Sequence, residues 1–182
     1  MDLTVSGRRA VGGLAIAALL VGLAIALDGP MSKAVNGVGG LAWLLSTVFL
    51  IRFLRTVRHR LVPAASVAVV VLVLATVIRP SDVWAASVGF FLGGAVVSVL
   101  AAEKRLAWSA MVPAMWLPVH LSLAIARGIA GVAPRIRTDP PPTAALVPLA
   151  MVIGALAGGA AVRAFSRRRQ TPAGMSRQPT TG

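Results

Sequence analysis

Long apolar runs separated by short polar segments dominate the chain, and six of them approach the length of a membrane-spanning helix. Roughly 20 apolar residues, within a range of about 17–25, cross the hydrocarbon core of a bilayer as an α-helix. Backbone groups in lipid must be bonded internally, and the alternation typical of a β-barrel is absent, so the pattern predicts helices. The predicted spans are residues 10–27, 38–54, 61–78, 83–102, 106–129 and 143–165. The fold class is therefore all-α: a polytopic integral membrane protein with one transmembrane helical domain over residues 1–165.

The distribution of basic residues predicts the orientation of these spans. With six spans, thirteen of the eighteen basic residues lie at the two termini and in the loops after the second and fourth spans. These segments all fall on one side of the membrane, and cytoplasmic segments carry the excess of Lys and Arg. Both termini are therefore expected in the cytoplasm. The five basic residues on the other side are Lys33, Arg79, Arg127, Arg135 and Arg137.

The net charge of +13 raises the question of nucleic-acid binding, which the composition disfavours. Hydrophobic residues make up 57% of the chain and charged residues 13%, against about 25% charged residues in a soluble domain. The basic residues stand in short clusters between apolar runs, whereas a nucleic-acid domain gathers them on one folded surface. The expected partners are the lipid bilayer and other membrane protein subunits, with no nucleic acid. The preference for Arg over Lys, with abundant Ala, Val and Gly, favours a bacterial source and hence the bacterial inner membrane.

The two ends of the chain allow further expectations. The first apolar run ends in Ala24–Ala26 and resembles a cleavable signal peptide, but it is longer than the usual run of about 7–15 residues. It is treated as the first span, and its cleavage would leave the orientation of the other spans unchanged. Residues 166–182 are polar, basic and without periodicity, so we expect a disordered cytoplasmic tail.

The residues that carry most enzymatic and metal chemistry are scarce. The five acidic residues all fall in termini or predicted loops, there are two histidines, and there is no cysteine. Proton relays and cation sites in membranes rely on intramembrane Asp, Glu or His, and metal-dependent hydrolysis needs clustered ligands. The sequence therefore predicts no catalytic constellation, no metal site and no cofactor.

The predicted fifth span departs from this apolar pattern in the stretch MVPAMWLPVHLSLAIARG, residues 111–128. Two prolines interrupt the helical hydrogen bonding, which predicts a bend. At 100° per residue, Trp116, His120 and Arg127 lie on one side of the helix, which we expect to face the bundle interior. Arg127 could instead extend to the outer interface, and His120 could donate to a neighbouring helix. The alternative that carries function is a binding site for a small or anionic ligand, lined by these three residues.

Small residues recur at helical spacing in three spans and predict close helix packing, either within the chain or against another chain. They are Ala18, Gly22 and Ala26; Gly89 and Gly93; and Ala150, Gly154 and Gly158. In size and span count the chain is similar to the substrate-binding membrane subunits of energy-coupling-factor vitamin transporters. Those subunits dock through an Ala-x-x-x-Ala pattern in the first span, and the chain departs from it with Ala18 and Gly22, so it is not assigned to that family. The expected function is a transport or substrate-binding membrane subunit, or alternatively a non-catalytic accessory or assembly subunit of a larger membrane complex.

Overall fold

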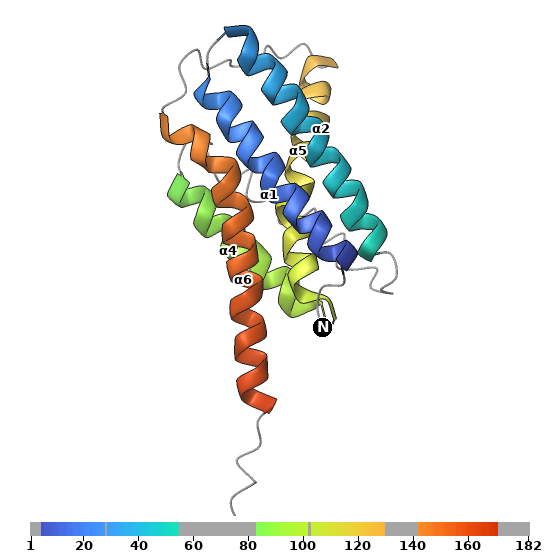
Figure 1. The fold of residues 1–182 in the computed structure, drawn as a ribbon. Helices are drawn as coiled ribbons and strands as arrows, with labels where there is room; N and C mark the ends of the chain where they lie inside the picture. Colours follow the sequence, from blue (N-terminus) through green and yellow to red (C-terminus); the bar gives the residue numbers. More distant parts are fainter. Residues whose placement is uncertain (1–4, 28, 55–82, 102, 130–141, 171–182) are drawn as a thin grey trace, which may run out of the picture.

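The computed structural model describes residues 5–27, 29–54, 83–101, 103–129 and 142–170, and these form an all-α structure (Figure 1). The all-α prediction is thereby confirmed. The predicted span over residues 61–78 lies outside the described residues. The elements are α1 Val5–Ala26, α2 Gly29–Leu54, α4 Val83–Leu100, α5 Arg105–Ile129, the 3-10 helix η1 Pro142–Leu146 and α6 Val147–Gln170.

Four of the helices are long and apolar enough to cross a membrane, namely α1, α2, α4 and, together with most of η1, α6. Their length and composition identify a multi-pass membrane protein in contact with lipid. Helix α5 forms over almost the residues predicted for the fifth span, but it is not among these four. It contains two prolines and a histidine in its middle and has an arginine near each end, and these residues make it less apolar than those four helices.

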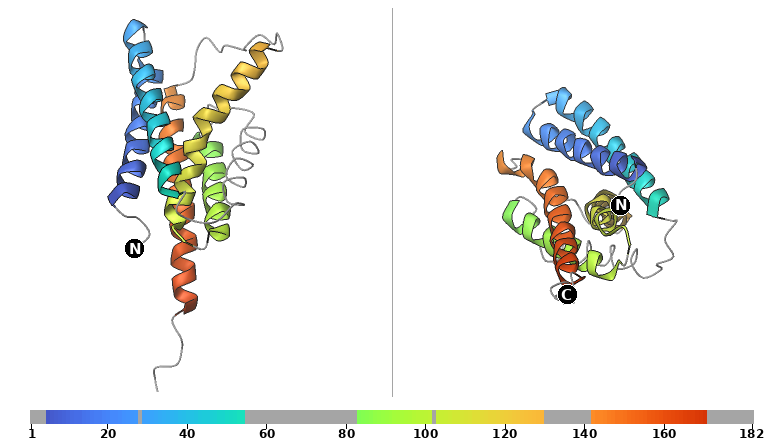
Figure 2. Two further views of the ribbon diagram at one scale, coloured as in Figure 1. Left: turned by 90° about the vertical axis from the view of Figure 1, so that its right-hand side faces the viewer. Right: turned by 60° about the horizontal axis from the view of Figure 1, so that its bottom comes forward.

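The described helices form two pairs with α5 between them (Figure 2). Helices α1 and α2 run antiparallel, since Gly13 lies against Ser46 and Gly39 lies against Leu20 and Val21. Helices α4 and α6 run in the same direction, since Gly154 lies against Ser87 and Gly158 lies against Phe91. The first half of α5, where residues 107–114 are buried, packs against both pairs and completes the core.

The pairing of α4 with α6 depends on the small residues that the sequence singled out. A Cβ atom on Gly154 would lie 2.6 Å from the carbonyl oxygen of Ser87, and one on Gly158 would meet the carbonyl oxygen of Phe91 even more closely. Only a residue without a side chain permits this backbone approach. The packing predicted for this row of residues is confirmed for both glycines, and the partner is another helix of the same chain.

Small residues also bring α1 against the start of the last helical segment. Gly22 is buried, and a Cβ atom on it would meet the carbonyl oxygen of Ala145 in η1. Ala18 is fully buried in the core, whereas Ala26 is exposed. The first two members of this predicted row therefore serve packing within the chain.

A small polar cluster joins α4, α5 and α6. The hydroxyl of Ser98 donates to the carbonyl oxygen of Arg105 at 3.1 Å, and that of Ser109 donates to the carbonyl oxygen of Leu106 at 2.9 Å. Both serines are fully buried, and Gly159 leaves room for both of them. Each hydroxyl is satisfied by a backbone carbonyl, so the polar atoms are buried without a large desolvation cost.

Three helix ends differ from the sequence prediction by five residues or more, and the first is the start of α1, which begins at Val5 where residue 10 was predicted. Helix α2 begins at Gly29, nine residues before the predicted 38, because Gly29 takes a φ of 76° and Pro30 suits the first turn of a helix. Helix α6 continues to Gln170, so residues 166–170, which were predicted as part of the disordered tail, are helical. Arginine is a good helix former, and positive charge near a helix C-terminus is favourable.

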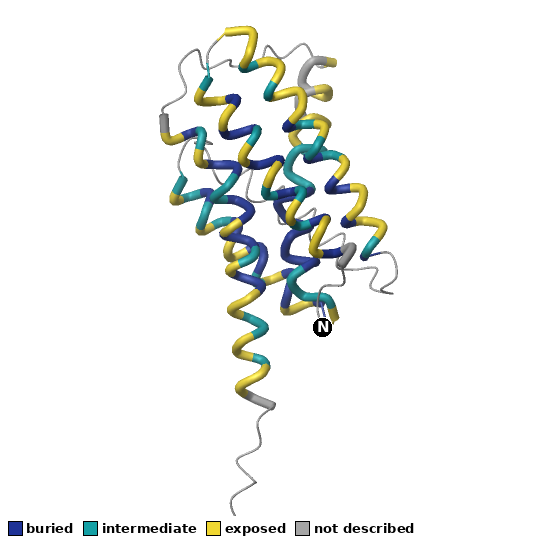
Figure 3. Tube along the Cα trace, viewed as in Figure 1, coloured by how far each residue is buried: buried dark blue, intermediate teal, exposed yellow. Residues whose placement is uncertain are grey.

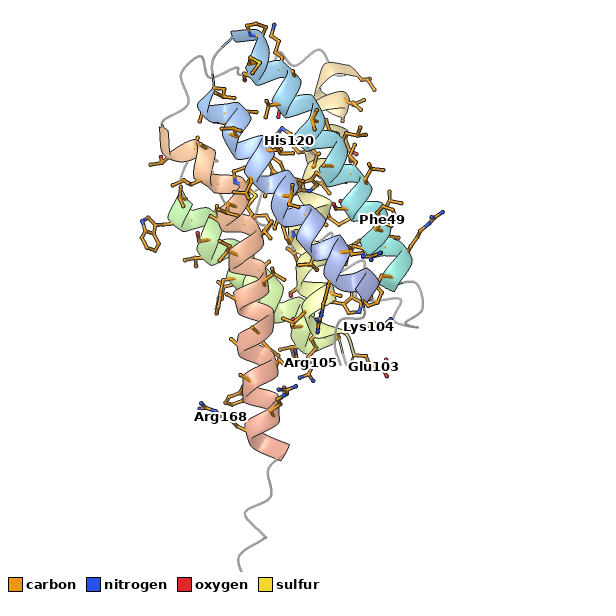
Figure 4. The ribbon with its side chains drawn as sticks, viewed as in Figure 1. Phe49, Glu103, Lys104, Arg105, His120 and Arg168 are labelled. Carbon is orange, nitrogen blue, oxygen red and sulfur yellow. The ribbon has the colours of Figure 1, made fainter. Side chains whose placement is uncertain are left out.

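The helix directions bring eight of the basic side chains that the structure describes to one end of the bundle, called here the basic end (Figure 1). The N-termini of α1 and α5 and the C-termini of α2, α4 and α6 lie there. Lys33, near the start of α2, lies at the opposite end. The basic end is defined by Arg8, Arg9, Arg52, Lys104, Arg105, Arg163, Arg167 and Arg168. Figure 4 labels Lys104, Arg105 and Arg168 among them.

Candidate functional site

Helix α5 is buried along its first half and exposed along its second half. Residues 107–114 are buried among the neighbouring helices, whereas Leu121, Ile125 and Ile129 are exposed, the last at 84%. Figure 2 shows the second half of α5 leaning away from α1 and α2, and Figure 3 colours the described residues by their burial. The change occurs between Pro113 and Pro118, which agrees with the bend that the two prolines predict.

The backbone carbonyl that Pro118 leaves without its helical donor is satisfied from α2. Proline has no N–H, so the carbonyl oxygen of Ala114, four residues earlier, loses its usual partner. The indole Nε1 of Trp43 donates to this oxygen at 3.2 Å, and the hydroxyl of Thr47 lies 3.0 Å from it. Trp43 is fully buried and Thr47 nearly so. This pair of contacts, called here the carbonyl clamp, fixes α2 to α5 at the bend.

Three aromatic rings extend from the carbonyl clamp toward the surface. The rings of Trp43 and Trp116 are tilted at 54° with centroids 5.7 Å apart. Trp116 and His120 are one helical turn apart on α5, and their rings stack with centroids 5.4 Å apart and an angle of 16°. The row begins at the buried Trp43, passes the half-buried Trp116 and ends at the exposed His120. The structure thus brings together two of the three predicted ligand-binding residues.

The exposure of His120 departs from the sequence expectation that its side would face the bundle interior. Trp116 follows the expectation in part, since it packs against the core, but His120 is exposed on the second half of α5, which leans away from α1 and α2 (Figure 2). Arg127 belongs to α5 two turns further on, about 10 Å along the axis at 1.5 Å per residue. Its side chain lies outside the part of the chain that the structure describes.

Trp43 and Thr47 were missed as members of this site. Their span reads as a continuous apolar helix, and nothing in it links residue 43 to residue 114. The only signal was indirect, because a proline within a membrane helix implies that a donor on some neighbouring helix satisfies the freed carbonyl.

The site offers an aromatic surface and one exposed imidazole. A neutral imidazole donates one hydrogen bond and accepts another, and the stacked indole of Trp116 holds the ring against the helix. The hydroxyl of Ser122 donates to the carbonyl oxygen of Pro118 at 2.8 Å, so its hydrogen bond stays within α5. Among the described residues, no group of three or more His, Asp or Glu side chains could hold a metal ion. The arrangement therefore suits binding of a polar group.

Comparison of the chain with models of protein families, with curated proteins and with solved structures finds no significant match. The candidate site accordingly stands on its own geometry.

Proposed function

We propose that this multi-pass membrane protein is a non-catalytic transport or substrate-binding subunit for a small solute, including anionic solutes. The observation that carries the proposal is the stacked pair Trp116–His120, exposed beside the bend in α5. An ionisable side chain within a membrane is costly when it faces lipid, and such residues usually face a cavity or a polar partner. A polar solute bound at this position would provide that partner.

Each residue of the proposed site has a distinct role. Trp116, held against Trp43 at 5.7 Å, provides a fixed apolar surface for the solute. His120 forms a hydrogen bond through the edge of its ring. Arg127, on the same side of α5 in the helical projection, would contribute charge attraction for an anion.

We expect His120→Leu to abolish the cellular phenotype or solute binding, while expression and melting temperature persist. Leucine has about the volume of histidine but lacks both ring nitrogens. If His120 served only packing, the substitution would be tolerated or would stabilise the protein, because it removes a polar group from hydrocarbon. The measurement is complementation of a deletion strain beside a thermal melt of each variant. The matched control is Ser122→Ala, because Ser122 is also exposed on α5. Arg127→Gln should weaken the binding of anionic solutes more than the binding of neutral ones. Full complementation by His120→Leu would end the proposal.

We further place the protein in the bacterial cytoplasmic membrane with six spans and both termini inside. The collection of basic side chains at one end of the described helices supports this orientation, because positive segments remain on the cytoplasmic side. A reporter active only in the cytoplasm should work when fused after Gly182 and fail when fused after Asp139. Activity after Asp139, or its loss after Gly182, would contradict the topology.

A second candidate function, an accessory subunit of a larger membrane complex, is favoured by the outer half of α5. Ile125 and Ile129 are 64% and 84% exposed there, on a helix that leaves its neighbours. Gly154 and Gly158, which the sequence offered as a contact for another chain, are already covered by α4, and this lowers the support for the second function. An accessory subunit would co-purify with larger proteins in a fixed ratio from native membranes in mild detergent, whereas a binding subunit would bind solute after purification alone.

A further inference from the structure

The face of α2 that forms the carbonyl clamp continues beyond it, away from the basic end. Asn36, Gly40, Trp43 and Thr47 follow one another at spacings of four, three and four residues. Residues at such spacings share one face of a helix. Trp43 and Thr47 show that this face is turned toward α5, because both contact the carbonyl oxygen of Ala114. Asn36 and Gly40 therefore also lie on the side of α2 that is turned toward α5.

The helix directions bring His120 of α5 close to the level of Gly40. Helix α2 ends at the basic end and α5 begins there, so the two helices run in opposite directions (Figure 1). The ring contact between Trp43 and Trp116 sets their register. At about 1.5 Å per residue, Gly40 lies about 4.5 Å and His120 about 6 Å beyond this contact, with Asn36 one turn beyond Gly40. The stacking of His120 on Trp116 keeps its ring on the side of α5 that meets Trp43.

Beyond the carbonyl clamp the two helices separate. Figure 2 shows the second half of α5 leaning away from α2. A Cβ atom on Gly40 would meet nothing within 4 Å, and Asn36 and His120 are exposed. Neither of these two side chains forms a hydrogen bond within the part of the chain that the structure describes. The region between the two faces, called here the α2–α5 fork, is defined by Asn36, Gly40, Trp116 and His120.

The charge at this end of the bundle favours an anion. Lys33, three residues before Asn36, is exposed and is the only charged side chain that the structure describes at this end. Glu103 is the only carboxylate among the described residues, and it belongs to the turn between α4 and α5 at the basic end. The amide nitrogen of Asn36 and a ring nitrogen of His120 are hydrogen-bond donors. The α2–α5 fork thus combines two donors with a nearby positive charge.

We propose that the α2–α5 fork is the solute site and that its solute is a small organic carboxylate, bound between Asn36 and His120. This inference rests on the proposed function, and it adds α2 as a second wall of a site whose other residues belong to α5. The two oxygens of a carboxylate accept one hydrogen bond from each helix, and Lys33 attracts the charge. The apolar part of the solute lies against the half-buried Trp116, and Gly40 leaves room for it.

A carboxylate suits the α2–α5 fork better than a cation or inorganic phosphate does. A cation would be repelled by Lys33 and would meet no carboxylate among the residues described at this end. Inorganic phosphate has no apolar part to cover Trp116, and exposed donors alone gain little when they exchange water for an anion. An organic carboxylate uses both the donors and the aromatic ring.

Equilibrium dialysis of the purified full-length protein with radiolabelled benzoate tests the proposal. Benzamide, a neutral molecule of the same shape, should compete about tenfold more weakly than unlabelled benzoate, and inorganic phosphate should not compete. Asn36→Leu should weaken benzoate binding about tenfold, because a hydrogen bond to a charged group is lost. Lys33→Gln should weaken it by up to about fivefold, with a smaller effect at high salt.

Two glycines of α2 supply matched variants that fill space without disturbing the fold. A Cβ atom on Gly37 would also meet nothing within 4 Å, but Gly37 lies about a quarter of a turn around α2 from the centre of the row that faces α5. Gly40→Leu should place its side chain in the α2–α5 fork and weaken benzoate binding about tenfold. Gly37→Leu should leave the binding unchanged.

The outcomes distinguish failure of this inference from failure of the proposed function. Loss of the cellular phenotype in His120→Leu, combined with no saturable binding of benzoate or with unchanged binding in Asn36→Leu and Gly40→Leu, would leave the proposed function standing and overturn the inference. An equal loss of binding in Gly37→Leu and Gly40→Leu would contradict it as well. A smaller particle mass in Gly40→Leu would assign the α2–α5 fork to a second copy of the chain and would overturn the carboxylate.

Discussion

Replacing Gly158 with alanine is expected to lower the free energy of unfolding by about 1–3 kcal/mol, although the change adds only one methyl group. The new Cβ atom would meet the carbonyl oxygen of Phe91 and would lie 2.9 Å from the backbone nitrogen of Ala95. Both contacts are to the backbone of α4, which cannot yield as the end of a flexible side chain can. Helices α4 and α6 would therefore have to separate along a buried contact.

The matched control is Gly12→Ala in α1, where a Cβ atom would meet nothing within 4 Å. Alanine is the better helix former by about 0.5–1 kcal/mol in an exposed helix interior. Gly12→Ala should therefore leave the free energy of unfolding unchanged or raise it slightly, whereas the same type of substitution at Gly158 should lower it. Apparent melting temperatures of both variants in the same mild detergent test this. Equal melting temperatures would mean that α4 and α6 are not in backbone contact at Gly158.

The sequence was a good guide to where the helices lie, because length and apolar composition are local properties. The start of α4 was predicted at the observed residue, and α5 was predicted within one residue at its start. The start of α2 was placed too late, since Lys33 and Asn36 were treated as outside the span although the helix continues through them. Helical periodicity also placed Trp116 and His120 on one side of α5, and the stacking of their rings agrees with that.

The sequence was a poorer guide to what each helix face contacts, because contacts depend on distant parts of the chain. The rule that ionisable residues face the interior of a bundle predicted a buried His120, but the bend in α5 exposes it. The contact of Trp43 with Ala114 joins residues 71 positions apart, and no local pattern carries that information. Small residues showed that close approach was possible at Gly154 without showing which helix approached.

Removing both donors of the carbonyl clamp should be the other strongly destabilising change. Trp43→Phe combined with Thr47→Val leaves the Ala114 carbonyl oxygen buried without the two groups that now satisfy it. An unsatisfied buried acceptor costs about 1–3 kcal/mol. The Thr47 hydroxyl also lies 2.9 Å from the carbonyl oxygen of Trp43, so it can bond within its own helix. Thr47→Val alone should therefore cost less than Trp43→Phe alone.

Loss of packing at Trp43 would also destabilise the protein, and Pro118→Ala separates this effect from the loss of the hydrogen bonds. Alanine at residue 118 restores an N–H that can donate to the Ala114 carbonyl oxygen within α5. In that background the double substitution at Trp43 and Thr47 should cost less by about 1–3 kcal/mol, because the acceptor stays satisfied. The unchanged protein, Pro118→Ala, the double variant at Trp43 and Thr47 and the variant with all three substitutions form a thermodynamic cycle, which is followed by their melting temperatures. The interaction energy between position 118 and the pair of positions 43 and 47 isolates the carbonyl clamp. An interaction energy of zero would show that Trp43 stabilises the bundle by packing alone and that the carbonyl freed by Pro118 gains nothing from α2.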